Sequence, residues 1–166
     1  MKTQRTLNEL INFSKASYGW FTSNKDNPNT ALGKAIQGIM PQIQTLLKPI
    51  GDLEMNHIKT IDDLMVSMCD EHHVEKSQQP NQPPTIQHKH VFTNLESYNK
   101  YNDKVDELNK ENENKRKVLL ETTVDIEPVF CTEMPPFKVF PPEIQAPFIG
   151  LVVREKKESE IKLVKS

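Results

Sequence analysis

Histidine and cysteine side chains gather on both sides of one polar segment of the chain. Cys69, His72 and His73 precede this segment, and His88 and His90 follow it. One residue separates His88 from His90, so in a strand both side chains would face the same side. Thiolate and imidazole are common zinc ligands, and a loop that closed one half onto the other could form a tetrahedral zinc site.

A second interpretation of the same five residues remains open. Their spacing matches none of the usual zinc modules. His72 and His73 also follow the expected end of a helix, where the helix dipole favours the charged imidazolium. The spacing therefore favours a structural or surface role. The alternative is a zinc-binding protein, either structural or a metal-dependent hydrolase.

Other groups of residues that could bind a metal or act in catalysis give weaker signals. The pairs Asp62–Asp63 and Asp70–Glu71 could hold a divalent cation, but neighbouring residues on a helix point in different directions. The sequence contains no glycine-rich phosphate loop, no nucleophile elbow and no His-Glu-x-x-His pattern. Cys131 lies among apolar residues and prolines, which predicts an inert thiol. We therefore expect no catalytic residue and no cofactor, with zinc as the alternative cofactor. The question of an enzyme stays open and leans toward a protein that is not one.

Composition restricts the function classes further. A chain of 166 residues predicts a single domain over residues 1–166. The net charge of -2 disfavours nucleic-acid binding, which requires clustered basic residues. The apolar run Phe148–Val153 is far shorter than the roughly 20 residues of a membrane span. Two cysteines distant in sequence predict free thiols and a cytoplasmic location.

The central stretch of the chain predicts a strand, a long helix and a second strand. Alternation of residue types predicts a strand over Thr85–Phe92, and Thr93 with Glu96 forms a capping box before a helix over Asn94–Leu120. A second alternating segment covers Thr123–Phe130. We expect the segments Ile86–Phe92 and Val124–Phe130 to pair as a small antiparallel sheet.

The residues before this stretch have the apolar spacing of helices. Apolar residues predict an amphipathic helix over Leu7–Phe21, with Leu7, Leu10, Ile11, Tyr18 and Phe21 on its stripe and Trp20 beside it in the core. A second stripe from Leu32 to Ile50 continues across Pro41 without a change of phase, which predicts one kinked helix ending near Pro49. A third helix over about Leu53–Cys69 carries Ile58, Ile61, Met65 and Met68; its separation from the second stays open. The expected fold class is α+β: a small helical bundle with a long central helix and a small antiparallel β-sheet.

Three segments are expected to lie outside this core. Residues 72–85, rich in glutamine and proline, predict a mobile loop, and residues 154–166 predict a charged tail. The polar section Asn109–Lys117, with Asn109, Glu113 and Lys117, predicts a projecting turn or a partner-binding surface. The proline-rich segment after Glu133 displays Phe137 and Phe140, which also suit partner binding.

The order of these elements resembles small bacteriophage proteins of unknown function from tail-module genes. The resemblance rests on a helical pair, the strand end His90-Val91-Phe92, a charged helix ending in Leu119-Leu120-Glu121, and the acidic strand Val124-Asp125-Ile126-Glu127. It implies a phage origin, in the host cytoplasm or the virion, and carries over no site residue. Together the patterns predict a non-enzymatic interaction or structural protein that binds a viral or host protein. The long stripe of the second helix also favours a homodimer.

Overall fold

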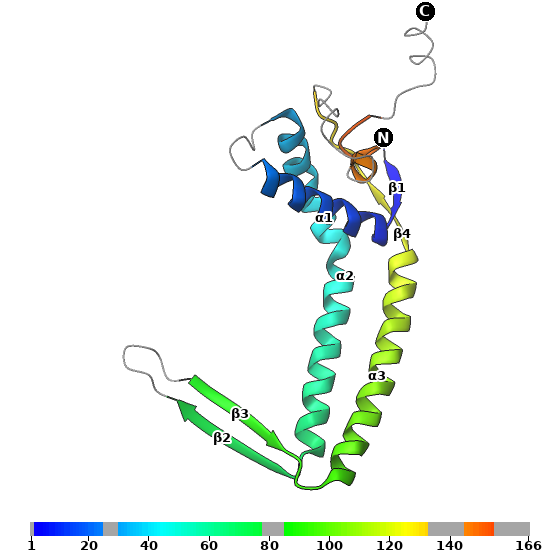
Figure 1. Cartoon of the computed structure of the whole chain (residues 1–166). Helices are drawn as coiled ribbons and strands as arrows, with labels where there is room; N and C mark the ends of the chain where they lie inside the picture. The colour runs from blue at the N-terminus through cyan, green and yellow to red at the C-terminus, as the bar shows by residue number, and fades with distance from the viewer. Residues whose placement is uncertain (1, 25–29, 78–84, 133–144, 155–166) are drawn as a thin grey trace, which may run out of the picture. The chain divides into compact units, whose positions relative to one another are not determined.

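The computed structural model describes residues 2–24, 30–77, 85–132 and 145–154 (Figure 1). Its elements are β1 (Thr3–Thr6), α1 (Leu7–Ser23), α2 (Ala31–Met68), β2 (Glu71–Ser77), β3 (Thr85–Val91), α3 (Leu95–Glu121), β4 (Thr123–Ile126) and the short 3-10 helix η2 (Ala146–Phe148). Helices and small antiparallel sheets confirm the predicted α+β class. None of the helices in these ranges is long and apolar enough to cross a bilayer.

The chain forms two compact units. Unit 1 comprises Met1–Pro49 and Val118–Ser166, and unit 2 comprises Ile50–Lys117. The helices α2 and α3 therefore each contribute residues to both units. The single domain over residues 1–166 stays a prediction.

Each unit contains its own two-stranded antiparallel sheet. In unit 1, β1 pairs with β4, from Thr3 opposite Ile126 to Thr6 opposite Thr123. In unit 2, β2 pairs with β3, from Glu71 opposite Val91 to Ser77 opposite Thr85. The predicted pairing of Ile86–Phe92 with Val124–Phe130 is wrong, because each strand finds a partner that the sequence did not reveal.

The strand β2 lies where we expected a mobile loop. The loop prediction is wrong for residues 72–77, and residues 78–84 lie outside the described residues. Strand β2 reads Glu-His-His-Val-Glu-Lys-Ser, so it has no apolar alternation by which a strand is recognised. Its pairing with β3 instead provides the backbone hydrogen bonds that stabilise both strands.

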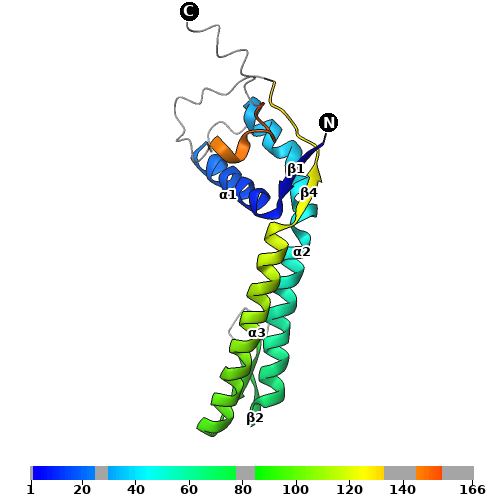
Figure 2. The same ribbon diagram turned by 90° about the vertical axis from the view of Figure 1, so that its right-hand side faces the viewer.

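The core of unit 1 forms between α1, the first part of α2 and the segment around η2. The buried apolar side chains of α1 are Leu7, Leu10, Phe13 and Trp20. Phe13 and Phe148 are both almost fully buried and meet edge to face, with their ring centroids 5.4 Å apart. Figure 2 shows β1 leading into α1 beside its partner β4.

The buried stripe of α1 differs in part from the predicted one. Trp20 is buried, which confirms its predicted place in the core, whereas Tyr18 is 77% exposed. Phe13 and Ser17 occupy the buried stripe instead. The buried positions 7, 10, 13, 17 and 20 follow spacings of three and four, so Tyr18 falls outside their arc.

The helix α2 is continuous from Ala31 to Met68 and contains both Pro41 and Pro49. The single helix predicted across Pro41 is confirmed, and the end predicted at Pro49 is wrong. A proline removes one backbone hydrogen bond, and a helix continues through it where packing supports the flanking turns. Ile43 and Ile50, which flank Pro49, are both buried.

The start of α3 differs from the predicted capping box. The side chain of Asn94 accepts a hydrogen bond from the backbone N–H of Ser97 at 2.7 Å, so Asn94 is the cap. Leu95 is largely exposed, and Tyr101 is the buried residue among the described residues of α3. The ring of Tyr101 lies 5.1 Å from that of Phe92.

Candidate functional site

The hairpin of β2 and β3 brings the predicted histidine and cysteine cluster together. Cys69 follows directly after α2, and the backbone N–H of Asp70 donates to the carbonyl of Val91 at 3.0 Å. This bond closes the base of the hairpin beside the end of α2. In the strand register, His72 lies directly opposite His90. The cluster therefore draws on the residue directly after α2 and on the strands β2 and β3.

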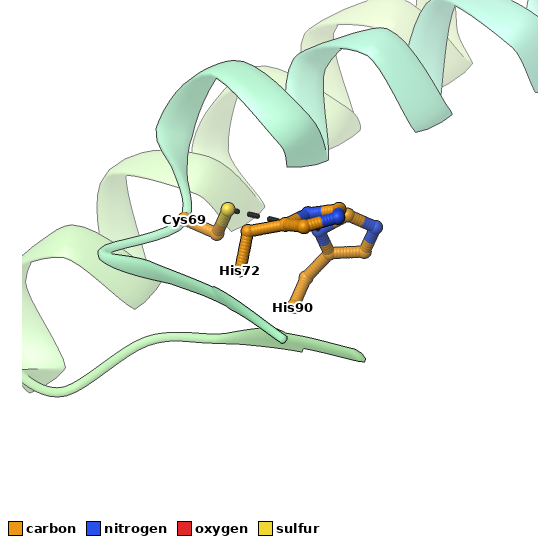
Figure 3. A group of neighbouring side chains, drawn as sticks. All are labelled: Cys69, His72 and His90. Atoms are coloured by element: carbon orange, nitrogen blue, oxygen red, sulfur yellow. Dashed lines mark hydrogen bonds between the residues drawn. The ribbon is translucent and has the colours of Figure 1, made fainter. Parts of the chain in front are cut away.

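Four of the five predicted residues form a continuous chain of contacts. The Sγ atom of Cys69 lies 3.7 Å from His90 Nδ1, which lies 3.0 Å from His72 Nδ1 (Figure 3). The other ring nitrogen of His72, Nε2, lies 3.1 Å from His88 Nδ1. Because His88 and His90 both contact His72, the prediction that they face one side is confirmed. One ligand atom each from Cys69, His72 and His90 lies within 4.8 Å of the others.

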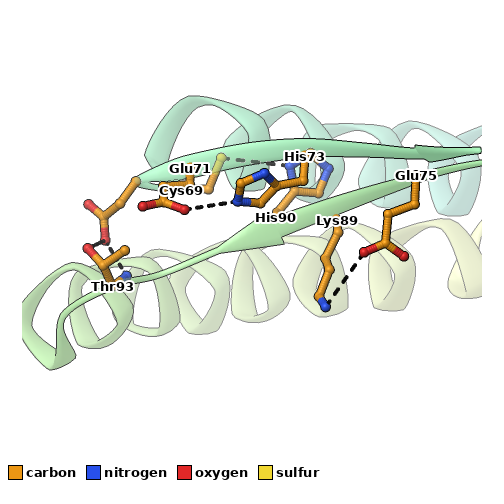
Figure 4. Close-up of polar contacts among 8 residues, drawn as sticks. Cys69, Glu71, His73, Glu75, Lys89, His90 and Thr93 are labelled. Atoms are coloured by element: carbon orange, nitrogen blue, oxygen red, sulfur yellow. Dashed lines mark hydrogen bonds and ion pairs between the residues drawn. The ribbon is translucent and has the colours of Figure 1, made fainter.

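The structure does not bring His73 into this group. His73 lies opposite Lys89 in the register, and its Nε2 atom lies 2.9 Å from a carboxylate oxygen of Glu71 (Figure 4). Successive residues of a strand face opposite sides, so His72 and His73 cannot both join one cluster. Among the five candidates, His73 is therefore the one that forms an ordinary surface pair.

Neutral imidazole is favoured at His72. The pKa of His72 is lowered, first by loss of hydration and then by the neighbouring charges of His90, His88 and His73. A neutral imidazole ring keeps a lone pair on one nitrogen, and a cation binds through this lone pair. The surroundings of His72 therefore favour the protonation state that metal binding requires.

Asp70 connects the hairpin to the start of α3, a role that the sequence did not indicate. One carboxylate oxygen of Asp70 accepts from the backbone N–H of Thr93 at 2.7 Å and from its hydroxyl at 3.1 Å. The other oxygen accepts from the hydroxyl of Ser97 at 3.2 Å. The hydrogen bond from the backbone of Thr93 is the main reason that the pKa of Asp70 is lowered, and burial opposes it. Asp70 thus serves as an anchor rather than as half of an acidic metal site.

The polar section of α3 has contacts with α2 within unit 2. Asn109 Oδ1 lies 2.9 Å from His57 Nε2, and Arg116 Nε lies 3.2 Å from a carboxylate oxygen of Glu54. The section is part of one continuous helix, α3, which confirms the helix predicted over Asn94–Leu120. Asn109, Glu113 and Lys117 are all exposed, and their role in partner binding stays a prediction.

The structure has an exposed apolar stripe on α2 that the sequence did not indicate. Met55, Ile58 and Val66 are 71%, 61% and 54% exposed, and we call these three residues the α2 stripe. At 100° per residue they fall within about 80° of one another around the helix. The helix predicted over Leu53–Cys69 carries Ile58 together with Ile61, Met65 and Met68, and these last three residues are half-buried.

The side of α2 opposite Met55 and Val66 faces α3. Leu53 and Leu64 are half-buried there and line open grooves whose other wall includes Leu108 of α3. The second part of α2 therefore has two apolar sides, and among the described residues of unit 2 only one of these sides has a partner. A single helical pattern cannot show which side a neighbouring helix will cover, and this is why the stripe was missed.

Phe137 and Phe140, the remaining predicted partner-binding residues, lie outside the described residues. Comparisons with models of protein families, with curated proteins and with solved structures find no match to this chain.

Proposed function

We propose that this is a non-enzymatic protein that binds another protein through the α2 stripe. The observation that supports the proposal is the exposure of Met55, Ile58 and Val66 on one side of α2, while the opposite side faces α3. A helix that serves only a two-helix unit needs one apolar side. A second apolar side on the same helix is typical of a surface that a partner covers.

The chemistry of the stripe indicates the kind of partner. Methionine, isoleucine and valine offer dispersion contacts and no directional hydrogen bond. The residues occupy three levels of a helix over twelve positions, which is the spacing at which a second helix lies along the first. The partner that fits best is therefore an amphipathic helix, supplied either by another protein or by a second copy of this chain.

We include a phage origin in the proposal, with a viral or host protein as the partner. The support is the element order that resembles phage tail-module proteins. The three histidines and Cys69 do not enter this function.

The proposal is tested by comparing the proteins retained by three forms of the full chain. The forms are the wild type, a variant with Met55, Ile58 and Val66 all changed to Ser, and a Leu95→Ser control. Leu95 is 72% exposed and lies in unit 2 but on α3, so it matches the stripe residues in character and exposure. We expect at least one protein that the wild type and the control retain and the triple variant loses.

Quantitative mass spectrometry identifies the retained proteins. Light scattering measures the mass of each form and so tests whether the partner is a second copy of this chain. Identical retention and identical mass for all three forms would show that the α2 stripe binds no protein.

A further inference from the structure

Among its described side chains, the hairpin of β2 and β3 has no apolar cluster that would hold it together. Its described side chains are mostly charged or histidine, and Val74 is 53% exposed. A two-stranded hairpin alone is marginally stable in water, because its backbone hydrogen bonds only replace those to solvent. The cluster of Cys69, His72 and His90 lies at the base of this hairpin, where it meets the end of α2.

The distances in this cluster are close to those of a tetrahedral zinc site. Zn–N bonds of about 2.05 Å and a Zn–S bond of about 2.3 Å imply edges of about 3.3 Å between two nitrogens and about 3.6 Å between nitrogen and sulfur. The structure has 3.0 Å between His72 Nδ1 and His90 Nδ1, and 3.7 Å between His90 Nδ1 and Cys69 Sγ. Shifts of a few tenths of an ångström would bring these two edges to the tetrahedral values. The third edge, between the ligand atoms of Cys69 and His72, is at most 4.8 Å long and would shorten when an ion binds.

We propose that Cys69, His72 and His90 bind one Zn²⁺ ion, which fastens the hairpin to the end of α2. One thiolate with two imidazoles is a ligand set that zinc favours over magnesium and calcium, which take oxygen ligands. Binding releases the thiol proton of Cys69 to solvent. The proton between His72 Nδ1 and His90 Nδ1 is the ring proton of His90, and by exchange with solvent it moves to His90 Nε2, so that both imidazoles stay neutral. No oxidation or reduction is involved.

His88 acts as a positioning residue for this ion. His72 Nε2 lies 3.1 Å from His88 Nδ1, and we assign the proton between them to His72 Nε2. This tautomer leaves His72 Nδ1, which lies 3.0 Å from His90 Nδ1, without a proton and able to bind the ion. A hydrogen bond from the outer nitrogen of a metal-binding histidine fixes its tautomer and its ring orientation. The described residues supply three ligands, so the fourth tetrahedral position falls to water.

The test uses the full chain, purified without a histidine tag from cells grown with added zinc. Metal content per chain is measured by mass spectrometry for the wild type and four variants: Cys69→Ser, His90→Asn, His88→Asn and His73→Asn. The His73 variant is the matched control, because His73 is a neighbour of His72 in β2 but faces the other side and pairs with Glu71.

We expect about one zinc per chain in the wild type and in the His73 variant, and loss of bound zinc in the Cys69 and His90 variants. For the His88 variant we expect zinc affinity to fall by about 10- to 100-fold, the usual effect of losing a partner of a metal ligand. Cobalt-loaded protein provides a second measurement: a thiolate-to-cobalt charge-transfer band should appear in the wild type and be absent in Cys69→Ser.

Hydrogen exchange tests the fastening role separately. Chelation should speed exchange at the amides of β2 and β3 in the wild type and leave α1 unchanged. Circular dichroism confirms that each variant keeps the helical content of the wild type. Less than about half an equivalent of zinc in the wild type would overturn the proposal. Retention of zinc by both ligand variants, or loss of zinc from the His73 control, would overturn it as well.

Discussion

The substitution Ile58→Ser tests whether Ile58 belongs to a binding surface or to the folding core. Ile58 is 61% exposed, so its removal takes little apolar area out of the folded chain. Exposed substitutions usually change the free energy of unfolding by less than about 0.5 kcal/mol, whereas loss of a buried isoleucine costs about 2–5 kcal/mol. We therefore expect Ile58→Ser to leave the stability of the free protein nearly unchanged.

The effect on binding should be much larger. Complete burial of such a side chain stabilises by about 1.5–3 kcal/mol, so covering the exposed part of Ile58 contributes about 1–2 kcal/mol to binding. A partner that covers it should therefore bind Ile58→Ser about 5- to 30-fold more weakly. For all three stripe residues the same reasoning gives about 3–5 kcal/mol, a loss between about a hundredfold and several thousandfold.

Two assays check this prediction on the same preparations. Urea unfolding measures the stability of each variant, and calorimetry with the protein retained by the wild type, or dilution in the case of a dimer, measures its affinity. Leu95→Ser is the control, with a similar exposure on another helix and no expected loss of affinity. Destabilisation of Ile58→Ser by more than about 2 kcal/mol would refute the reasoning, because only a buried side chain has that effect. Unchanged affinity would refute it equally.

Three further predictions concern the scaffold. Phe13→Ala should lower the free energy of unfolding by about 3–5 kcal/mol because it empties a fully buried site, whereas exposed Tyr18→Ser should change it by less than about 0.5 kcal/mol; urea unfolding measures both. Burial raises the pKa of the Cys131 thiol, so at mildly alkaline pH iodoacetamide should modify Cys131 more slowly in the folded than in the urea-unfolded chain, and equal rates would contradict this. The unfolded thiol ionises first as pH rises, so this group should lower stability above the ordinary thiol pKa. Asp70→Ala removes three hydrogen bonds to Thr93 and Ser97, so amide exchange at the start of α3 should become faster while α1 is unchanged.

The helices were largely predictable because their signals are local. Helical spacing of apolar residues gave the extent of α1 and the first part of α2, and alternation gave β3. The strand pairing was not predictable in the same way. Strand β2 contains a single apolar residue, Val74, so only its hydrogen bonds to β3 define it as a strand. The four residues Thr3–Thr6 of β1 are likewise too short and too polar to give a pattern.

The residue types of the candidate cluster could be predicted from the sequence. Which of the two adjacent histidines, His72 or His73, belongs to it could not. The alternation of His88 and His90 with Lys89 correctly placed both histidines on one side of a strand. The choice between His72 and His73 depends on the register of β2 with β3, which no local pattern encodes. The exposure of Ile58 was hidden for a related reason: it depends on where α3 lies along α2 rather than on the sequence of α2 itself.

The most direct test of the proposed binding surface is photo-crosslinking in the cells that produce the protein. A photoreactive residue is placed at position 58 of the full chain or, in a parallel sample, at position 95. We expect position 58 to capture a defined protein, either a second copy or another chain, that position 95 does not capture. The product should disappear when Met55 and Val66 are changed to Ser. If positions 58 and 95 capture the same products, or neither captures any, the α2 stripe is not a protein-binding surface.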